Sequence, residues 1–265
     1  MQIALIEELH VTVFEVTPRA GRLSARRPRS SHIMKSIRLL SAVLTLATAS
    51  AADPMAPIKP DTYKAPVKVA CIGDSITEGV GAEQGRSYPT QLQELLGDKW
   101  KVSNFGVSGR TLLKKGDHPY WIEAKYQNAL KSEPDVVIIM LGTNDTKPQN
   151  WEHEKEFVAD YTELVKSFQA LPSKPRIYAC RPVPVPGEGN FGINEKNLQE
   201  WIKRINKLAK DMDIGVIDMH KALERKDDML PDRVHPNTEG AGEMAKAAFE
   251  ALTGDKAPKP AGAKK

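Results

Sequence analysis

Four short polar clusters contain the residue types that could carry chemistry in this chain. They are Gly73-Asp74-Ser75, NFGVSGRT at 104–111, GTND at 142–145 and DRVHPN at 232–237. Each cluster places a serine, asparagine, aspartate or histidine beside residues typical of turns, where a backbone can approach another group closely. A site at which all four clusters meet would hold a hydroxyl, an imidazole, a carboxylate and an amide.

The first and last clusters contain the elements of nucleophilic catalysis. Ser75 follows an apolar run, and its hydroxyl becomes a useful nucleophile only with a base within hydrogen-bond reach. His235 can be that base. Asp232, three residues earlier, can then hold the imidazole in the correct tautomer. The chain order Ser, Asp, His therefore predicts a catalytic triad of Ser75, Asp232 and His235.

The two middle clusters offer donors for an oxyanion hole. Attack on an ester carbonyl places negative charge on its oxygen, and pre-positioned N–H groups stabilise that charge. We expect three donors, namely the backbone N–H groups of Ser75 and Gly106 and the side-chain amide of Asn144. Any one cluster alone is compatible with an ordinary turn or helix cap, so the prediction depends on all four occurring together.

The elements that must position these clusters alternate between short β-rich runs and amphipathic stretches of helical length. Predicted strands are Val67–Ile72, Lys101–Phe105, Val136–Leu141, Arg176–Ala179 and Gly215–Asp218, and predicted helices are Tyr88–Leu96, Trp121–Lys131, Trp151–Ala170, Glu195–Asp211 and Thr238–Thr253. This alternation predicts an α/β fold, a three-layer α/β/α sandwich of flavodoxin-like type with a five-stranded parallel sheet. Ligands in such sheets bind beyond the carboxyl ends of the strands, where the first three clusters fall.

The clusters also carry a family resemblance. GDSITEG at 73–79 resembles the first sequence block of the SGNH hydrolases, also called GDSL-type esterases and lipases, and the other three clusters resemble the later blocks. The resemblance runs from about residue 68 to 252. It implies Ser75 as nucleophile, Gly106 and Asn144 as oxyanion donors, His235 as base and Asp232 as its orienting acid. It further implies hydrolysis of carboxylic esters without a metal or cofactor.

Several features bear on the substrate. SYPTQLQELLG at 87–97 is similar to the bacterial branch that contains carbohydrate O-acetylesterases, lysophospholipases and thioesterases. Trp151 and Phe191 are among the loop aromatics that suit the faces of pyranose rings. The candidate substrate-binding residues are Asp74, Tyr120, Trp121 and Arg181. Core packing of the aromatic side chains and a structural ion pair of Arg181 are the alternatives.

The expected activity is therefore that of a serine esterase acting on O-acetyl groups of carbohydrates, whether the ester is a small molecule or a polysaccharide. A lysophospholipase or acyl-thioesterase is the first alternative. A non-catalytic carbohydrate-binding domain is a remote second alternative, because a binding module has no need to keep Ser75, Asp232 and His235 together. The sequence gives no indication of oligomeric state.

The first 52 residues contain a pattern typical of a secretory signal peptide. After Met34 come two basic residues, the apolar run Leu39–Ala47 and the small residues Ala49-Ser50-Ala51. We expect 34–52 to be a signal peptide, 1–33 to be an upstream gene-model extension, and the protein to be exported to the periplasm or secreted. The apolar run is too short for a permanent membrane anchor. The remaining expected segments are a linker at 53–64, the hydrolase domain at 65–254 and a basic flexible tail at 255–265.

Charge and cysteine content limit the classes of partner and metal site that the sequence suggests. The chain has a net charge of +4, but removing residues 1–52 would leave equal numbers of basic and acidic residues. The charge therefore gives no reason to expect a nucleic acid partner. Cys71 and Cys180 fall in different predicted strands, so we expect two buried free thiols and no cysteine-based metal site.

Overall fold

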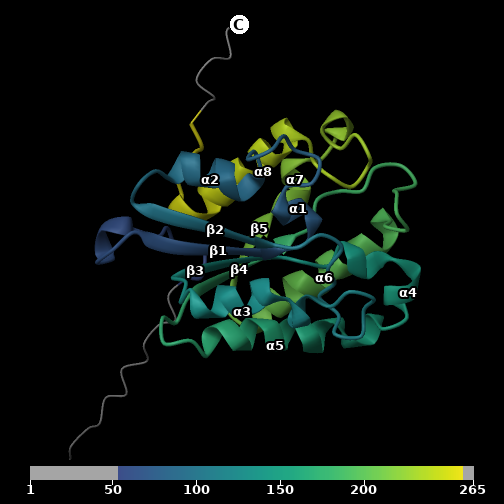
Figure 1. Cartoon of the computed structure of the whole chain (residues 1–265), viewed down its shortest axis with the longest axis horizontal. Coiled ribbons are helices and arrows are strands. Elements are labelled where there is room, and N and C mark those ends of the chain that lie inside the picture. The colour runs from purple at the N-terminus through teal and green to yellow at the C-terminus, as the bar shows by residue number, and fades with distance from the viewer. Residues whose placement is uncertain (1–52, 259–265) are drawn as a thin grey trace, which may run out of the picture. The chain divides into compact units, whose positions relative to one another are not determined.

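The described part of the chain, residues 53–258 of a computed structural model, is built around one parallel sheet (Figure 1). Its strands are β1 (Val67–Gly73), β2 (Trp100–Gly106), β3 (Val136–Met140), β4 (Arg176–Arg181) and β5 (Gly215–Asp218), in the spatial order β2-β1-β3-β4-β5. Every residue of β3 is buried, as expected for a central strand of β-branched residues covered on both faces. The predicted α/β fold with five parallel strands is confirmed.

Helices cover both faces of the sheet. They are α1 (Ser75–Glu78), α2 (Tyr88–Leu96), α3 (Ala124–Lys131), α4 (Pro148–Trp151), α5 (Phe157–Gln169), α6 (Glu195–Asp211), α7 (Met219–Ala222) and α8 (Thr238–Thr253). Figure 1 shows α2, α7 and α8 on one face and α3, α5 and α6 on the other. Two apolar clusters match these layers. One joins the sheet to Leu92 and Met244, and the other joins it to Tyr126, Leu164 and Trp201.

Two helices begin later than the sequence pattern predicts. The helix expected from Trp121 begins at Ala124, after a short 3₁₀ turn at Tyr120–Ile122. The long helix expected from Trp151 begins at Phe157, because Pro148 opens a separate short helix that Trp151 ends. In both places a tryptophan that the pattern assigns to the longer helix instead packs against the protein interior from a short helical segment that precedes it.

Residues 53–64 pack against the sheet instead of forming the expected linker. Ile58 is only 5% exposed, and its N–H donates to the Leu252 carbonyl at 2.8 Å. The Arg176 guanidinium donates to the Pro54 carbonyl at 2.6 Å. The prolines correctly indicated a segment without long helices or strands. The segment nevertheless packs on the domain, because the Ile58 side chain is buried in the core. The expected signal peptide, the upstream extension and most of the basic tail lie outside the described residues.

Both cysteines are buried and free, as predicted. Cys71 lies in β1 and Cys180 in β4, with β3 between the two strands. Burial raises the pKa of Cys71 to about 12 and raises that of Cys180 as well, so neither thiol ionises at neutral pH. Within residues 53–258, none of the helices combines the length and apolar character needed to cross a lipid bilayer.

Candidate active site

The topology places the first and third polar clusters side by side. The chain leaves β1 towards β2 on one side of the sheet, and then returns to form β3 on the other side of β1. Parallel sheets that reverse strand order in this way have a crevice at the carboxyl ends of the two strands concerned. Ser75 follows β1 and Asn144 follows β3, so both lie at this switch point.

Ser75 is held at the start of a one-turn helix. The Asp74 carboxylate caps α1 by accepting the Ile76 N–H at 3.0 Å, which fixes the sharp turn out of β1. Ser75 is 8% exposed and is therefore mostly buried. Its own N–H is the first of α1 and has no acceptor among the described residues, as is usual at a helix start.

His235 and Asp232 approach Ser75 from the segment that precedes α8. Ser75 Oγ lies 2.9 Å from His235 Nε2, and His235 Nδ1 lies 2.6 Å from Asp232 Oδ2. The other carboxylate oxygen, Asp232 Oδ1, accepts the backbone N–H groups of Val234 at 3.0 Å and His235 at 2.7 Å. The carboxylate therefore holds both the imidazole ring and the loop that carries it.

These contacts also determine the charge of Asp232. Partial burial, the largest single influence, raises its pKa, but the hydrogen bonds from the His235 backbone, the His235 ring and the Val234 backbone together outweigh burial. The pKa of Asp232 is thus below the ordinary aspartate value. The group facing the imidazole is a carboxylate at neutral pH, suited to stabilising a protonated ring.

Asn144 directs its side-chain amide between the first two clusters. Its Nδ2 donates to the Arg110 carbonyl at 3.1 Å and approaches Asp74 Oδ2 at 3.4 Å. The side chain is buried, and its own carbonyl oxygen on the backbone accepts a hydrogen bond from Asn150 Nδ2 at 2.8 Å. Asn144 is therefore held from both sides, close to Ser75 and to the turn at 107–110.

Gly106 does not offer the free donor that the sequence suggested. Its N–H donates to Asn104 Oδ1 at 2.9 Å, and a Cβ at this position would lie 2.3 Å from the Glu78 backbone nitrogen. The glycine is needed for close packing of β2 against α1, and the expectation of an open N–H there is wrong. The mistake arose because NFGVSGRT contains two glycines and spacing alone did not distinguish their roles.

Gly109, which the sequence interpretation passed over, has the properties expected of such a donor. It adopts a left-handed backbone conformation with φ +77°, and a Cβ there would meet nothing within 4 Å. No acceptor for its N–H occurs in residues 53–258. Arg110, the next residue, accepts the Asn144 amide, so Gly109 lies in the turn that adjoins Asn144.

The four candidate substrate-binding residues all make structural contacts. Tyr120 is buried and its hydroxyl donates to the Phe105 carbonyl at 2.6 Å, while the Trp121 indole N–H donates to the Leu112 carbonyl at 2.7 Å. Arg181 forms an ion pair with Asp218 and donates to Asn206 Oδ1 at 2.8 Å. Asp74 caps α1 from a fully buried position. These contacts hold each side chain in place, and a role for any of the four in substrate binding stays a prediction.

Two further loop aromatics differ in their surroundings. Trp151 packs against Trp201, with ring centroids 4.6 Å apart, and contributes to the core. Phe191 is 56% exposed, and its ring centroid lies 5.8 Å from that of His235. Among the four aromatic residues that the sequence singled out, Phe191 alone has a solvent-exposed ring beside the candidate site.

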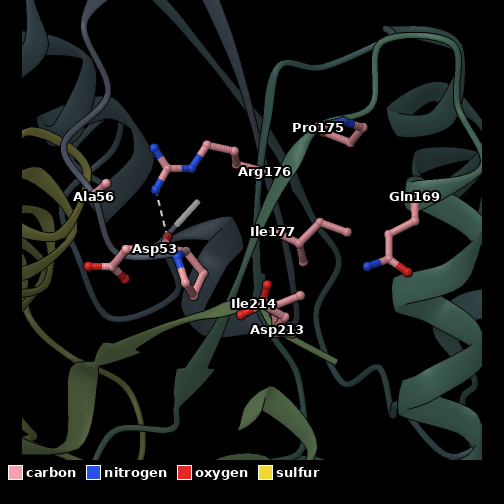
Figure 2. Close-up of a pocket in the computed structure, with 9 residues that line it drawn as sticks. Asp53, Ala56, Gln169, Pro175, Arg176, Ile177, Asp213 and Ile214 are labelled. Atoms are coloured by element: carbon pink, nitrogen blue, oxygen red, sulfur yellow. Dashed lines mark hydrogen bonds between the residues drawn. The ribbon is translucent and has the colours of Figure 1, made fainter. Parts of the chain in front are cut away.

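A separate cavity of about 270 Å³ lies at the amino-terminal ends of β4 and β5, at the end of the sheet opposite to Ser75 (Figure 2). It is lined by Arg176, the first residue of β4, and by Ile214, which directly precedes β5. Figure 2 shows the Arg176 guanidinium directed at the residue 53–56 segment. Because Ser75 follows the carboxyl end of β1, this cavity is remote from the candidate site.

The described residues contain no cluster of three or more His, Cys, Asp or Glu side chains suited to holding a metal ion.

Comparison with known families agrees with this fold. The profile of the GDSL-like lipase/acylhydrolase family matches residues 71–242, a span that begins in β1 and ends in α8. The chain belongs to this family.

Individual relatives carry more specific names. An acetylxylan esterase of Xylanibacter ruminicola is 39% identical over 207 residues, an alignment that covers 70% of this chain and 43% of that protein. The chain therefore spans less than half the length of that relative. A carbohydrate acetylesterase from Sinorhizobium meliloti superposes with a TM-score of 0.57 at 23% identity, covering 69% of this chain and 97% of the other. An acetyl xylan esterase gives a TM-score of 0.56 at 24% identity, with 70% and 100% coverage. The two solved structures show the shared fold.

Proposed function

We propose that this protein is a serine esterase that removes O-acetyl groups from carbohydrates, with Ser75, His235 and Asp232 as its catalytic triad. The observation that carries the proposal is the continuous pair of contacts from Ser75 Oγ to His235 Nε2 at 2.9 Å and from His235 Nδ1 to Asp232 Oδ2 at 2.6 Å. The expected export of the protein is consistent with a polysaccharide substrate.

The reaction follows from these positions. Ser75 Oγ attacks the ester carbonyl carbon while His235 Nε2 accepts the hydroxyl proton. Asp232 stabilises the imidazolium that forms and keeps Nε2 directed at Ser75. When the tetrahedral intermediate collapses, His235 donates its proton to the leaving alcohol oxygen and an acetyl-serine remains. Water, deprotonated by His235, then attacks the acetyl-serine and releases acetate with regeneration of Ser75.

Three donors would stabilise the oxyanion. They are the Ser75 N–H, which has no acceptor within residues 53–258, the Asn144 side-chain amide, and the Gly109 N–H in place of that of Gly106. Each such donor typically contributes about 2.7–4 kcal/mol to the transition state. Asn144 Nδ2 donates to the Arg110 carbonyl at 3.1 Å and approaches Asp74 Oδ2 at 3.4 Å, so the amide hydrogen in the longer contact with Asp74 is the one that would turn to the substrate oxygen.

The preference for acetyl esters of carbohydrates is supported by the relatives. The acetylxylan esterase at 39% identity is similar over 207 residues, and those residues correspond to less than half of that longer protein. The carbohydrate acetylesterase fold neighbour has almost the same length as the matched domain. An acetyl group also demands little room beside Ser75, which is enclosed by α1 and the segment before α8.

The experiment is a comparison of wild-type protein with the Ser75→Ala variant. Wild-type protein should release acetate from acetylated xylan and should hydrolyse p-nitrophenyl acetate much faster than the decanoate. Ser75→Ala should lose at least about 10⁴-fold in kcat on both acetyl substrates, because the nucleophile is gone. Acetylated pectin and acetylated sialic acid complete the substrate panel.

The matched control is Ser167→Ala, which alters a serine on α5 whose hydroxyl only bonds the Leu164 carbonyl. Both variants should keep the wild-type circular dichroism spectrum. Full activity in Ser75→Ala would show that another residue is the nucleophile. Faster cleavage of the decanoate than of the acetate would favour a lysophospholipase or thioesterase instead.

A further inference from the structure

We propose that Phe191 forms the platform for the alcohol part of the substrate, and that this alcohol is a sugar ring. The inference rests on the proposed function and deepens it, because it assigns a residue that selects the alcohol. Phe191 lies in the irregular segment between β4 and α6. It belongs to neither the triad nor the oxyanion donors.

The exposure of Phe191 is unusual for its residue type. Large aromatic side chains normally bury most of their surface, and Phe191 leaves 56% of its surface in contact with solvent. The other large exposed apolar residues in the described part of the chain are aliphatic, namely Met55, Val80, Ile122 and Val158. An exposed ring whose centroid lies 5.8 Å from the His235 ring is therefore placed where a bound molecule would cover it.

Phe191 is held in this position by the segment that carries the triad. Asn190 Nδ2 donates to the Asp232 carbonyl at 3.1 Å, and Asn190 Oδ1 accepts the Phe191 N–H at 2.8 Å. On the other side, Ile193 packs in a small apolar cluster with Val234, the residue directly before His235. The position of the ring is thus coupled to Asp232 and His235 at two points.

The backbone of Phe191 is itself constrained. Its φ of +53° lies in the left-handed region, which costs a side chain other than glycine some conformational energy. The Asn190 contacts on one side and the buried Ile193 on the other compensate for this cost. A phenylalanine that is strained, exposed and tied to the triad segment is better explained by contact with substrate than by folding.

Position beside His235 indicates which half of the ester Phe191 meets. His235 Nε2 must reach the leaving oxygen to protonate it, so the alcohol lies on the His235 side of Ser75. The acyl oxygen lies towards Asn144, on the other side. A pyranose ring presents a face of C–H groups that packs well on an aromatic ring, whereas its hydroxyls stay at the edge. Phe191 therefore suits a sugar alcohol.

A supporting role for the His235 ring is the competing explanation. Asp232 already holds that ring at Nδ1, and it also accepts the His235 backbone N–H at 2.7 Å. The two rings are tilted by 55° with centroids 5.8 Å apart, so Phe191 does not stack on the imidazole. An experiment that varies the alcohol while keeping the acyl group constant separates these explanations.

The experiment measures kcat and KM of wild-type protein, Phe191→Ala and Phe191→Trp on acetylated xylo-oligosaccharide and on ethyl acetate. The two substrates share the acetyl group and differ in the alcohol. Phe191→Ala should lower kcat/KM on the oligosaccharide about tenfold, mainly through KM, because a lost aromatic contact changes affinity by about that factor. On ethyl acetate it should stay within about twofold of wild type. Phe191→Trp should retain most of the oligosaccharide activity, because an aromatic face remains.

The matched control is Val158→Ala, which truncates an exposed apolar side chain on α5 and should leave both substrates unaffected. Equal losses on both substrates in Phe191→Ala would overturn the inference and indicate support of His235. Unchanged kinetics on both would overturn it as well. Wild-type protein that cleaves ethyl acetate but no acetylated sugar would overturn this inference and the proposed substrate, and would leave the proposed role of Ser75 intact.

Discussion

At the scale of single residues, two buried carboxyl groups flank Asn144. Asp145 accepts the backbone N–H groups of Leu112 at 3.0 Å and Leu113 at 2.7 Å, and Asp74 caps α1 while approaching Asn144 Nδ2. Burial raises the pKa of each group to about 7, although backbone hydrogen bonds oppose the shift. The Asp145 charge further raises the pKa of Asp74. Both carboxyl groups hold neighbouring backbone N–H groups in place, and both bind a proton more tightly than an ordinary aspartate does.

This affinity predicts how stability changes with pH. The pKa of Asp145 is about 7 in the folded protein against an ordinary value of 3.8, so the folded state binds the proton more tightly than the unfolded state. The resulting stabilisation is fully present below the unfolded pKa and is lost as pH rises through about 7. Asp145→Asn is neutral at every pH and should therefore weaken the fall in unfolding free energy between pH 5 and pH 7.5, measured by urea denaturation.

Asp98→Asn, at an exposed position before β2, is the matched control and should leave the pH dependence of wild type unchanged. Curves for wild type and Asp145→Asn that run parallel over this range would show that Asp145 does not bind a proton there.

The candidate site was predictable from sequence to the extent that its residues directly follow a strand or precede a helix. Ser75, Asn144 and the Asp232–His235 pair were placed correctly near one another because parallel strands end at a common edge. Gly109 was missed because choosing between two glycines depends on a hydrogen bond from Gly106 to Asn104. That bond follows from the path of the backbone and leaves no mark in the residue spacing.

At the scale of elements, α1 and the turn at 107–110 form one unit. Glu78, the last residue of α1, accepts the Ser108 N–H at 2.7 Å and also accepts the Ser108 hydroxyl. In the strand that leads into this turn, Gly106 has no side chain, which lets β2 pack closely against the Glu78 backbone. The helix that carries the proposed nucleophile therefore also holds the turn that contains Gly109. The two halves of the proposed oxyanion hole are coupled through a single carboxylate.

Removing this carboxylate should loosen one oxyanion donor without touching the triad. We expect Glu78→Ala to lower kcat on p-nitrophenyl acetate by about tenfold, less than the 10²–10³-fold typical of losing a donor outright. KM should change little, because the donor acts mainly on the transition state. Glu78→Gln should recover part of the loss, since its amide oxygen still accepts the Ser108 N–H.

The control for this prediction is Glu83→Ala, because Glu83 is a nearby exposed acid whose backbone, not its side chain, bonds Thr238. If kcat of Glu78→Ala equals that of wild type, the turn at 107–110 does not depend on α1 and the coupling is wrong.

Element types followed from the sequence more closely than element boundaries did. All five strands and the helices Tyr88–Leu96, Glu195–Asp211 and Thr238–Thr253 match the predicted positions within two residues. Asn237 shows why the last of these succeeded, because its side chain caps α8 by accepting the Gly240 N–H at 2.9 Å. The predicted starts of α3 and α5 were wrong because Trp121 packs against the core from the 3₁₀ turn at Tyr120–Ile122 and Trp151 packs against it from α4. Tertiary packing decides both placements.

At the scale of the whole described unit, the two ends of the parallel strands differ in role. The carboxyl edge is the side of the sheet at which the strands end, and the amino edge is the side at which they begin. The carboxyl edge holds Ser75, Asn144 and the residues before α8. The amino edge is closed by residues 53–64, which bond the end of α8 through Leu252 and the start of β4 through Arg176. Because α8 begins beside His235 and ends near Ile58, it spans the distance between the two edges. Stability and chemistry can therefore be altered separately.

The residue that tests this separation is Ile58, which is 5% exposed and packs in the apolar cluster that includes Leu252. Ile58→Ala should lower the free energy of unfolding by about 2–4 kcal/mol, through lost burial and the cavity left behind. The ester hydrolysis rate of the folded variant should equal that of wild type well below its Tm. Ile122→Ala, at a 78% exposed position, should change stability by less than about 0.5 kcal/mol. A stable Ile58→Ala would mean that residues 53–64 rest on the sheet without supporting it. A folded Ile58→Ala variant with a lower ester hydrolysis rate would mean that packing at the amino edge affects the position of Ser75 and His235 through α8.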